Sequence, residues 1–101
     1  MIIEVASIAV KAGEEAAFEA AVAKAVDVLR GARGCKGIQL NRCIEEPNLY
    51  DVLIRWETLE SHTVDFRGSE LFQTWRALVG PHFAEAPKVR HYAVAMLARD
   101  F

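Results

Sequence analysis

The strongest constraint on the fold is the order in which strand-like and helix-like segments follow one another. Four segments are rich in β-branched, aliphatic and aromatic residues and read as strands: 2–10, 36–44, 49–57 and 89–97. Two segments with helical periodicity, 14–30 and 58–79, lie between them. The order β-α-β-β-α-β predicts a ferredoxin-like α+β fold, in which both helices cover one face of a four-stranded antiparallel sheet. A chain of 101 residues is expected to form a single domain over 1–101.

The first helix is predicted from apolar residues spaced three or four positions apart: Phe18, Val22, Ala25 and Leu29. Glu14 and Glu15 suit its N-terminus, and we expect Gly31 to end it in a left-handed C-cap conformation. The glycine-rich segment 31–37 follows a helix, whereas a phosphate-binding loop precedes one. The sequence therefore disfavours a phosphate site there.

The second helical segment contains a break inside the stretch DFRGSELFQTWR, at 65–76. We expect Gly68 to end one short helix and the Ser69 hydroxyl to cap the next by accepting backbone N–H groups. The second part then runs from Glu70 to Val79, before Gly-Pro at 80–81.

Both faces of the predicted sheet are apolar. In 49–57, Val52, Ile54 and Trp56 share one face, and Leu53 lies on the other. The segments 2–10 and 89–97 also carry apolar side chains on both faces. Because the helices cover only one face, we expect the second face to be buried in a homodimer, sheet against sheet.

Charge and composition disfavour several classes of partner. The net charge of −2 and the lack of a basic run argue against nucleic acid or an acidic membrane surface as a partner. The chain shows no basic leader and no long uncharged apolar segment, which predicts a cytoplasmic protein. Cys35 and Cys43 fall at opposite ends of one predicted strand, about 26 Å apart at about 3.3 Å per residue. A disulfide spans roughly 7 Å, so the two thiols are expected to stay reduced.

Residues 54–83, IRWETLESHTVDFRGSELFQTWRALVGPHF, resemble the antibiotic biosynthesis monooxygenase family, and the order of elements over the whole chain is similar to its dimeric α+β barrel. The resemblance implies a cofactor-independent monooxygenase that oxidises an electron-rich aromatic, such as a quinol or polycyclic phenol, with O2. It implies no metal and no cofactor. The ligand would lie between the sheet and helices of one subunit, where the protein excludes water, orients the ring and assists its deprotonation.

The resemblance also implies site residues. Trp56, His62 and Arg76 match positions of the cofactor-independent oxygenases, so we expect His62 to act as the base and Arg76 to stabilise a phenolate. Val52 departs from the pattern, because some of these enzymes carry a side-chain amide there, and this departure concerns how the substrate is positioned. The haem-degrading branch is a poor match, since its Asn, Trp and His positions fall on other residue types here.

Three more residues complete the predicted ligand site: Arg67, Phe72 and Trp75. Trp56 and Trp75 would stack on the ring, although the helical spacing favours a core role for Trp75. Each polar candidate has a structural alternative as well. His62 would otherwise be an exposed residue of a first helical turn, and the arginines would pair on the surface with an acidic neighbour, namely Asp65, Glu70 or Glu85.

The remaining histidines, His82 and His91, have no spacing of three or four to another histidine. A three-histidine metal site would therefore have to come from the tertiary fold. Two functional alternatives also stay open at this point. The same pocket could hold a small aromatic ligand without catalysis, or the core could be filled by Phe72, Trp75 and Phe83, leaving only a structural dimer.

Overall fold

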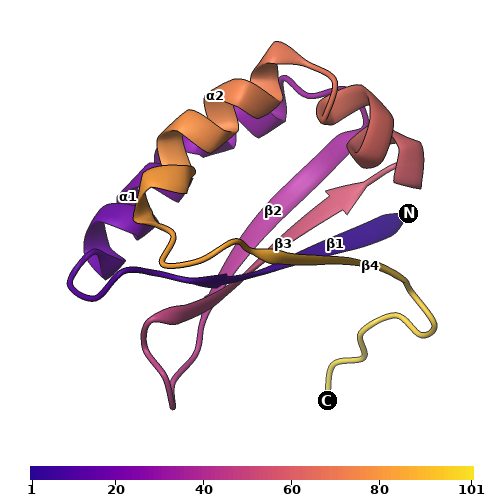
Figure 1. Cartoon of the computed structure of the whole chain (residues 1–101). Helices are drawn as coiled ribbons and strands as arrows, with labels where there is room; N and C mark the ends of the chain where they lie inside the picture. Colours follow the sequence, from indigo (N-terminus) through magenta and orange to yellow (C-terminus); the bar gives the residue numbers. More distant parts are fainter.

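The computed structural model describes residues 1–101 and shows two helices packed on one face of a four-stranded antiparallel sheet (Figure 1). Its elements are β1 (Ile2–Ala9), α1 (Glu15–Arg30), β2 (Cys35–Arg42), β3 (Leu49–Trp56), a π-helical turn (Ser61–Phe66), α2 (Glu70–Val79), a 3-10 turn (Gly80–His82) and β4 (Lys88–Ala93). The strand order is β2-β3-β1-β4, with β1 and β3 in the centre. The ferredoxin-like arrangement predicted from the sequence is confirmed.

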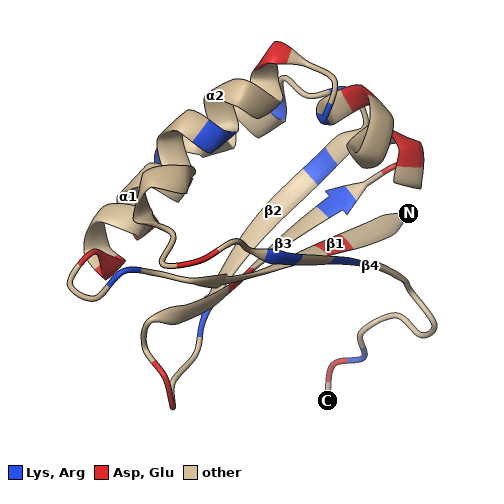
Figure 2. Cartoon of the chain, in the orientation of Figure 1, with Lys and Arg blue, Asp and Glu red and all other residues tan.

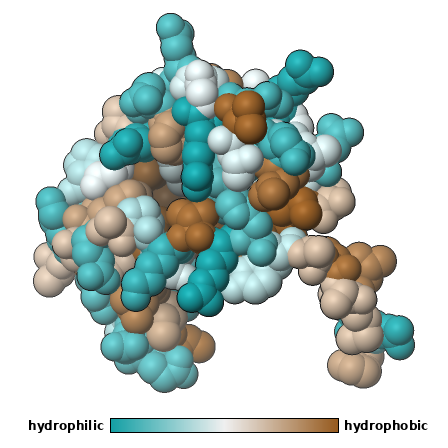
Figure 3. All heavy atoms as spheres, turned by 45° about the vertical axis from the view of Figure 1, so that its right-hand side comes forward, coloured by the Kyte–Doolittle hydropathy of each residue, from teal (hydrophilic) through white to brown (hydrophobic).

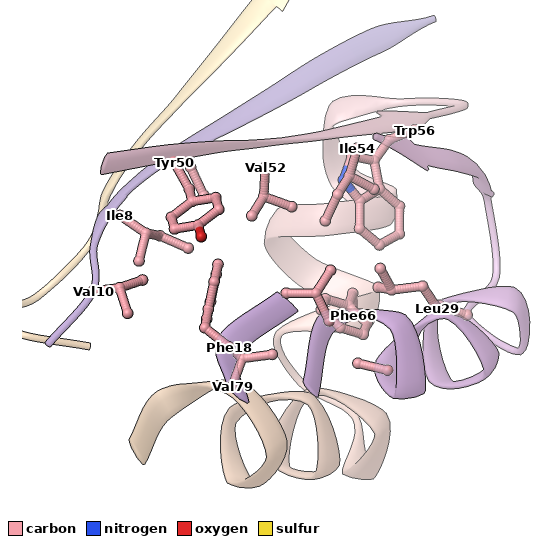
Figure 4. Close-up of a cluster of buried hydrophobic side chains, with 14 residues drawn as sticks. Ile8, Val10, Phe18, Leu29, Tyr50, Val52, Ile54, Trp56, Phe66 and Val79 are labelled. Carbon is pink, nitrogen blue, oxygen red and sulfur yellow. The ribbon is translucent and has the colours of Figure 1, made fainter. Parts of the chain in front are cut away.

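The core lies between the sheet and the helices. Alternate residues of β3 point toward the helices and are fully buried: Tyr50, Val52, Ile54 and Trp56 (Figure 4). They meet the predicted apolar face of α1, where Phe18 and Leu29 are also fully buried. Phe18 packs against Tyr50 with ring centroids 4.9 Å apart. Burial of large side chains of this kind, worth about 1.5 to 3 kcal/mol each, is the main stabilisation of the fold.

Two of the expected element boundaries are wrong. β4 ends at Ala93 rather than at residue 97. Gly31 continues the helical conformation with φ of −83°, and its N–H still bonds to the carbonyl of Asp27. The left-handed residue is Gly34, with φ of +80°, because the chain there turns closely past Ser61.

Ser69 occupies the N-cap position of α2, as expected, but its hydroxyl does not cap the helix. The Ser69 Oγ instead donates to the carbonyl oxygen of Phe66 at 2.7 Å. This bond therefore stabilises the C-terminal end of the π turn and not the N-terminus of α2.

The face of the sheet opposite the helices has no cover within the chain (Figure 1). Its central apolar side chains, Ile3, Val5 and Leu53, are half-buried, and they alternate with charged neighbours such as Arg55. Residues 94–101 follow β4 as a tail that carries exposed apolar side chains, and Figure 3 shows it standing away from the rest of the molecule.

Charged residues of both signs are spread along the chain (Figure 2). Both cysteines are free, as expected from their separation along one strand. Neither helix has the length and apolar composition needed to cross a membrane.

Candidate functional site

A cavity of about 750 Å³ lies between α2, the segment that follows it and the inner face of the sheet. Its walls are mostly aromatic and aliphatic, with a small number of polar groups, which is typical of ligand pockets. The apolar and small lining residues are Ala6, Ile8, Ile54, Phe66, Phe72, Trp75, Ala77, Gly80, Pro81, Phe83, Ala86, Pro87 and Val89. The polar lining residues are Glu4, His62, Arg67, Gln73, Arg76 and Glu85. The core is therefore not filled by its aromatic residues, which argues against the collapsed-pocket alternative.

The π turn fixes the place of His62 at one end of this cavity. Thr58 begins the turn, because its Oγ1 accepts the N–H of Ser61 at 3.1 Å. The N–H of Arg67 then bonds to the carbonyl of His62 at 3.1 Å, the five-residue spacing of a π helix. Gly34 packs against the Ser61 side chain with no room for a Cβ. The contact between Gly34 and Ser61 thus fixes the position of the turn, and His62 lies at the wall of the cavity.

His62 is buried, with 3% of its surface exposed, so it is not the exposed first-turn residue of the structural alternative. Its ring stacks on Trp56, with centroids 5.2 Å apart and planes at 21°. The Nδ1 atom lies 2.7 Å from Nε2 of His91, and the Nε2 atom lies 3.3 Å from Oε1 of Glu4. Both ring nitrogens therefore face protein groups.

Glu4 comes from β1, where it is the cross-strand partner of His91 on β4. Its Oε1 accepts the indole N–H of Trp56 at 2.9 Å, a buried hydrogen bond. The sheet register thus places Glu4 and His91 side by side. The π turn brings His62 into contact with both of them. We refer to Glu4, His62 and His91 as the acid–histidine cluster.

Burial shifts the titration of this cluster. It raises the pKa of Glu4, although the Trp56 hydrogen bond and the charge of Arg67 act in the opposite direction. Burial lowers the pKa of His62 to about 4, assisted by the charges of Arg67 and His91. It also lowers the pKa of His91, again with Arg67. Both imidazoles are consequently neutral at pH 7, so each carries one ring proton.

Arg67 and Arg76 form no salt bridge, so the surface pairs considered from the sequence are not formed. Both line the cavity. Arg76 lies over the Phe72 ring, with its Cζ 5.7 Å from the centroid. The wall of the cavity therefore includes two exposed arginines without a carboxylate partner, and an arginine of this kind can meet an anionic oxygen on a ligand.

The structure separates the predicted ligand residues into two groups. Phe72 and Trp75 line the cavity together with the two arginines and His62. Val52 and Trp56 are fully buried and do not line it. The indole of Trp56 reaches the cavity only through His62, on which it stacks, and through Glu4. The apolar character of Val52 consequently belongs to the core and does not set the polarity of the cavity.

The histidines do not form a three-histidine metal site. His62 and His91 adjoin, whereas His82 is bonded to Glu14 at 2.9 Å. No group of three or more His, Cys, Asp or Glu side chains in the structure is arranged to hold a metal ion.

Glu4 and His91 were not predicted as site residues from the sequence. Glu4 is the one acidic residue of β1, and its position shares a face with the buried Ala6 and Ile8. A carboxylate on the inner face of a strand is rare without a partner, so the position of Glu4 could have indicated a functional role. His91 gave no such signal, because only the pairing of β1 with β4 places it beside Glu4.

Comparison with known proteins gives consistent results. The sequence profile described as antibiotic biosynthesis monooxygenase matches residues 1–78. YczJ of Bacillus subtilis, which is uncharacterized, is 39% identical over 92 residues that cover 91% of this chain and 97% of YczJ.

Two solved structures show the likeness in three dimensions. A Bordetella bronchiseptica protein that carries the same family description is 50% identical, with a TM-score of 0.92 over 94% of this chain and 97% of its own. SnoaB of Streptomyces nogalater, a cofactor-independent oxygenase, has a TM-score of 0.81 over 98% of this chain and 97% of its own. Its identity of 14% limits that comparison to the fold.

Proposed function

Because the chain belongs to the antibiotic biosynthesis monooxygenase family, we propose that it is a cofactor-independent monooxygenase, acting as one domain over residues 1–101. Its substrate would be an electron-rich aromatic such as a quinol or a polycyclic phenol, and its oxidant O2. The observation that carries the proposal is the cavity of about 750 Å³, which joins aromatic walls to the buried Glu4 and His62 of the acid–histidine cluster.

The walls of the cavity suit a flat aromatic ligand. Phe72, Trp75 and Phe83 present rings to it, and such rings bind aromatic ligands by stacking or edge contacts worth about 0.5 to 1.5 kcal/mol each beyond their burial. The volume lies within the roughly 300 to 1,000 Å³ that is usual for small-molecule sites. A ligand that fills it would be withdrawn from water, which protects a reactive carbanion or peroxide from side reactions.

The overall reaction balances without an added electron donor. A phenol takes up one O2; one oxygen atom becomes a new ring carbonyl, and the other leaves as water with the hydroxyl hydrogen and the hydrogen of the attacked carbon. The substrate itself supplies the electrons. The protein is then required to remove the hydroxyl proton, to stabilise the phenolate and to exclude water.

The polar residues of the cavity can meet these requirements. The guanidinium groups of Arg67 and Arg76 are free to stabilise the phenolate oxygen, a charge-assisted contact. The acid–histidine cluster accepts the proton, and His62 is central to it because it contacts both Glu4 and His91. Trp56 supports His62 from behind.

A second candidate is a non-catalytic protein that binds a small aromatic in the same cavity. One observation favours it: both ring nitrogens of His62 face protein groups, so a ligand must compete with His91 or Glu4 for either of them. The two candidates agree on the ligand class and differ on turnover.

Oxygen uptake distinguishes them. Purified, metal-stripped protein is tested with a panel of reduced quinols and polycyclic phenols, corrected for autoxidation, beside the variant His62→Ala. Uptake that saturates with substrate and falls in the variant, with ligand affinity nearly unchanged, supports the oxygenase. Saturable ligand binding without oxygen uptake above background would contradict the oxygenase and support the non-catalytic binding protein.

We also propose that two copies assemble through the uncovered face of the sheet, where Ile3, Val5 and Leu53 and the apolar tail would be buried. An apolar face of this kind is costly to leave in water. The variants Leu53→Glu and Val94→Glu should yield monomers or insoluble protein, whereas Val64→Glu, a charge on the exposed π turn, should leave assembly unchanged. Size-exclusion chromatography with light scattering measures this. A stable dimer of Leu53→Glu would contradict the sheet-to-sheet arrangement.

A further inference from the structure

We propose that Glu4, rather than His62, is the catalytic residue that takes the hydroxyl proton of the ligand, and that His62 and His91 position it. The proposal deepens the proposed function and rests on it, since it names the base of that same reaction. It reverses the role that the sequence suggested for His62, for a reason that lies in the hydrogen bonds.

Both ring nitrogens of His62 already face groups of the protein. Its Nδ1 is 2.7 Å from Nε2 of His91, and its Nε2 is 3.3 Å from Oε1 of Glu4. An imidazole has only these two ring nitrogens. A ligand could reach one of them only by breaking a contact inside the protein.

Glu4 has a free oxygen. Its Oε1 accepts the Trp56 N–H and faces His62, while its Oε2 has no hydrogen-bond partner in the protein. No buried side-chain oxygen or nitrogen in the structure lacks a partner, so Oε2 cannot be sealed in the core. Glu4 lines the cavity, and Oε2 is its carboxylate oxygen that no protein donor occupies.

One proton arrangement satisfies the whole cluster when Glu4 is ionised. His91 then donates its Nε2–H to Nδ1 of His62, and the Nε2–H of His62 faces Oε1 of Glu4 at 3.3 Å. Trp56 donates to the same oxygen. Each contact then has one donor and one acceptor group, and the lone pairs of Oε2 are not used by any protein donor. The two histidines thus act as a rigid support that holds the carboxylate in place.

The proton step is balanced. The O–H bond of the ligand breaks, an O–H bond to Oε2 forms, and no electron changes hands. The negative charge moves from Glu4 to the ligand oxygen, where Arg67 and Arg76 line the cavity. Glu4 becomes a neutral acid, a form that its burial favours, and it can return the proton when the second oxygen atom leaves as water.

Several other titratable or charged groups bear on any pH profile of this site. They are His91 from β4, His62 and Arg67 from the π turn and the residue after it, Arg76 from α2, Glu85 before β4, and Cys35 from β2, whose pKa is raised by burial and by the charge of Glu4. The exposed Glu46, in the turn between β2 and β3, does not line the cavity and provides a matched control.

The test compares Glu4→Gln, His62→Gln and Glu46→Gln with the wild-type protein, using the best substrate of the oxygen-uptake panel. We expect Glu4→Gln to lower kcat by about 100-fold or more, as loss of a general base does, with ligand affinity from tryptophan quenching changed by less than about threefold. His62→Gln should lower kcat by only about tenfold and shift the acid limb of the kcat profile, because it repositions Glu4. Glu46→Gln should resemble wild type, because Glu46 is exposed and lies outside the cavity. If His62→Gln loses as much activity as Glu4→Gln, or if Glu4→Gln stays active, the proposal is overturned.

A binding measurement keeps the proposal separate from the proposed function. If the wild-type protein shows no uptake, the oxygenase fails, and Glu4 is tested with 2-naphthol and its methyl ether as probes. We expect naphthol affinity to rise with pH as Glu4 ionises. This rise should be absent in Glu4→Gln and present in Glu46→Gln, and the methyl ether should show none. Equal profiles in wild type and Glu4→Gln, or no binding of naphthol to either, would overturn the role of Glu4.

Discussion

Replacing His62 by glutamine should make the stability of the protein less dependent on pH between pH 8 and 5. In the folded protein, burial lowers the pKa of His62 to about 4 from the ordinary value of 6.5. A group whose pKa is lower in the folded state stabilises the fold above the unfolded pKa, and this contribution is lost as the pH falls toward the folded pKa. The window is therefore pH 6.5 down to about 4.

The size of the effect follows from the two pKa values. At pH 5 the unfolded imidazole is almost fully protonated and the folded one is mostly neutral. Their binding polynomials differ by a factor of about 30, which corresponds to about 2 kcal/mol. At pH 8 neither state binds a proton, so none of this stability has been lost. The wild-type protein should thus lose about 2 kcal/mol more than His62→Gln when the pH is lowered from 8 to 5.

Urea unfolding at a series of pH values, at constant ionic strength and protein concentration, measures this difference. His82→Gln is the matched control, because His82 lies outside the acid–histidine cluster and bonds to Glu14. Glu4 acts in the opposite direction, since its raised pKa adds stability as the pH falls. The comparison should therefore be repeated in the Glu4→Gln background. Parallel pH profiles for wild type and His62→Gln in both backgrounds would refute the reasoning, as would a titration of the His62 ring near pH 6.5 by NMR.

Two further predictions concern the supports of the site. Gly34→Ala should lower the free energy of unfolding by more than about 2 kcal/mol, because φ is +80° and the new methyl group would overlap Ser61, whereas Gly80→Ala, in open space at a helical φ, should change it by less than about 0.5 kcal/mol. Thermal melts compare the two, and equal shifts would mean that Gly34 does not hold the π turn. Tyr50→Phe should cost about 1 kcal/mol in urea unfolding, since its hydroxyl donates to the half-exposed Glu19 at 2.6 Å. An unchanged midpoint would show that this bond adds nothing to stability.

The sequence was sufficient for the architecture because the relevant signals are local. The apolar spacing of Phe18 and Leu29 predicted the buried face of α1, and the alternation in β3 predicted that Val52 and Trp56 are buried together. Helical and strand periodicities depend only on neighbouring residues, so no knowledge of tertiary contacts was needed.

The local details of the chain depended on packing instead. The sequence predicted a left-handed conformation at Gly31, directly after the helix. The structure places it at Gly34, where the chain approaches Ser61. The Ser69 hydroxyl was expected to accept N–H groups of α2. It donates instead to the Phe66 carbonyl at the end of the π turn. Periodicity carries no information about such choices between competing partners.

The sequence by itself determined the order of elements, the two faces of the sheet and five of the residues that line the cavity: His62, Arg67, Phe72, Trp75 and Arg76. Only the tertiary structure decided that Val52 and Trp56 lie outside that cavity and that Glu4, His62 and His91 meet. These three residues are separated by tens of positions and come from β1, the π turn and β4. Their contact depends on strand register and on burial, and burial also sets their protonation, so no spacing in the sequence could reveal it.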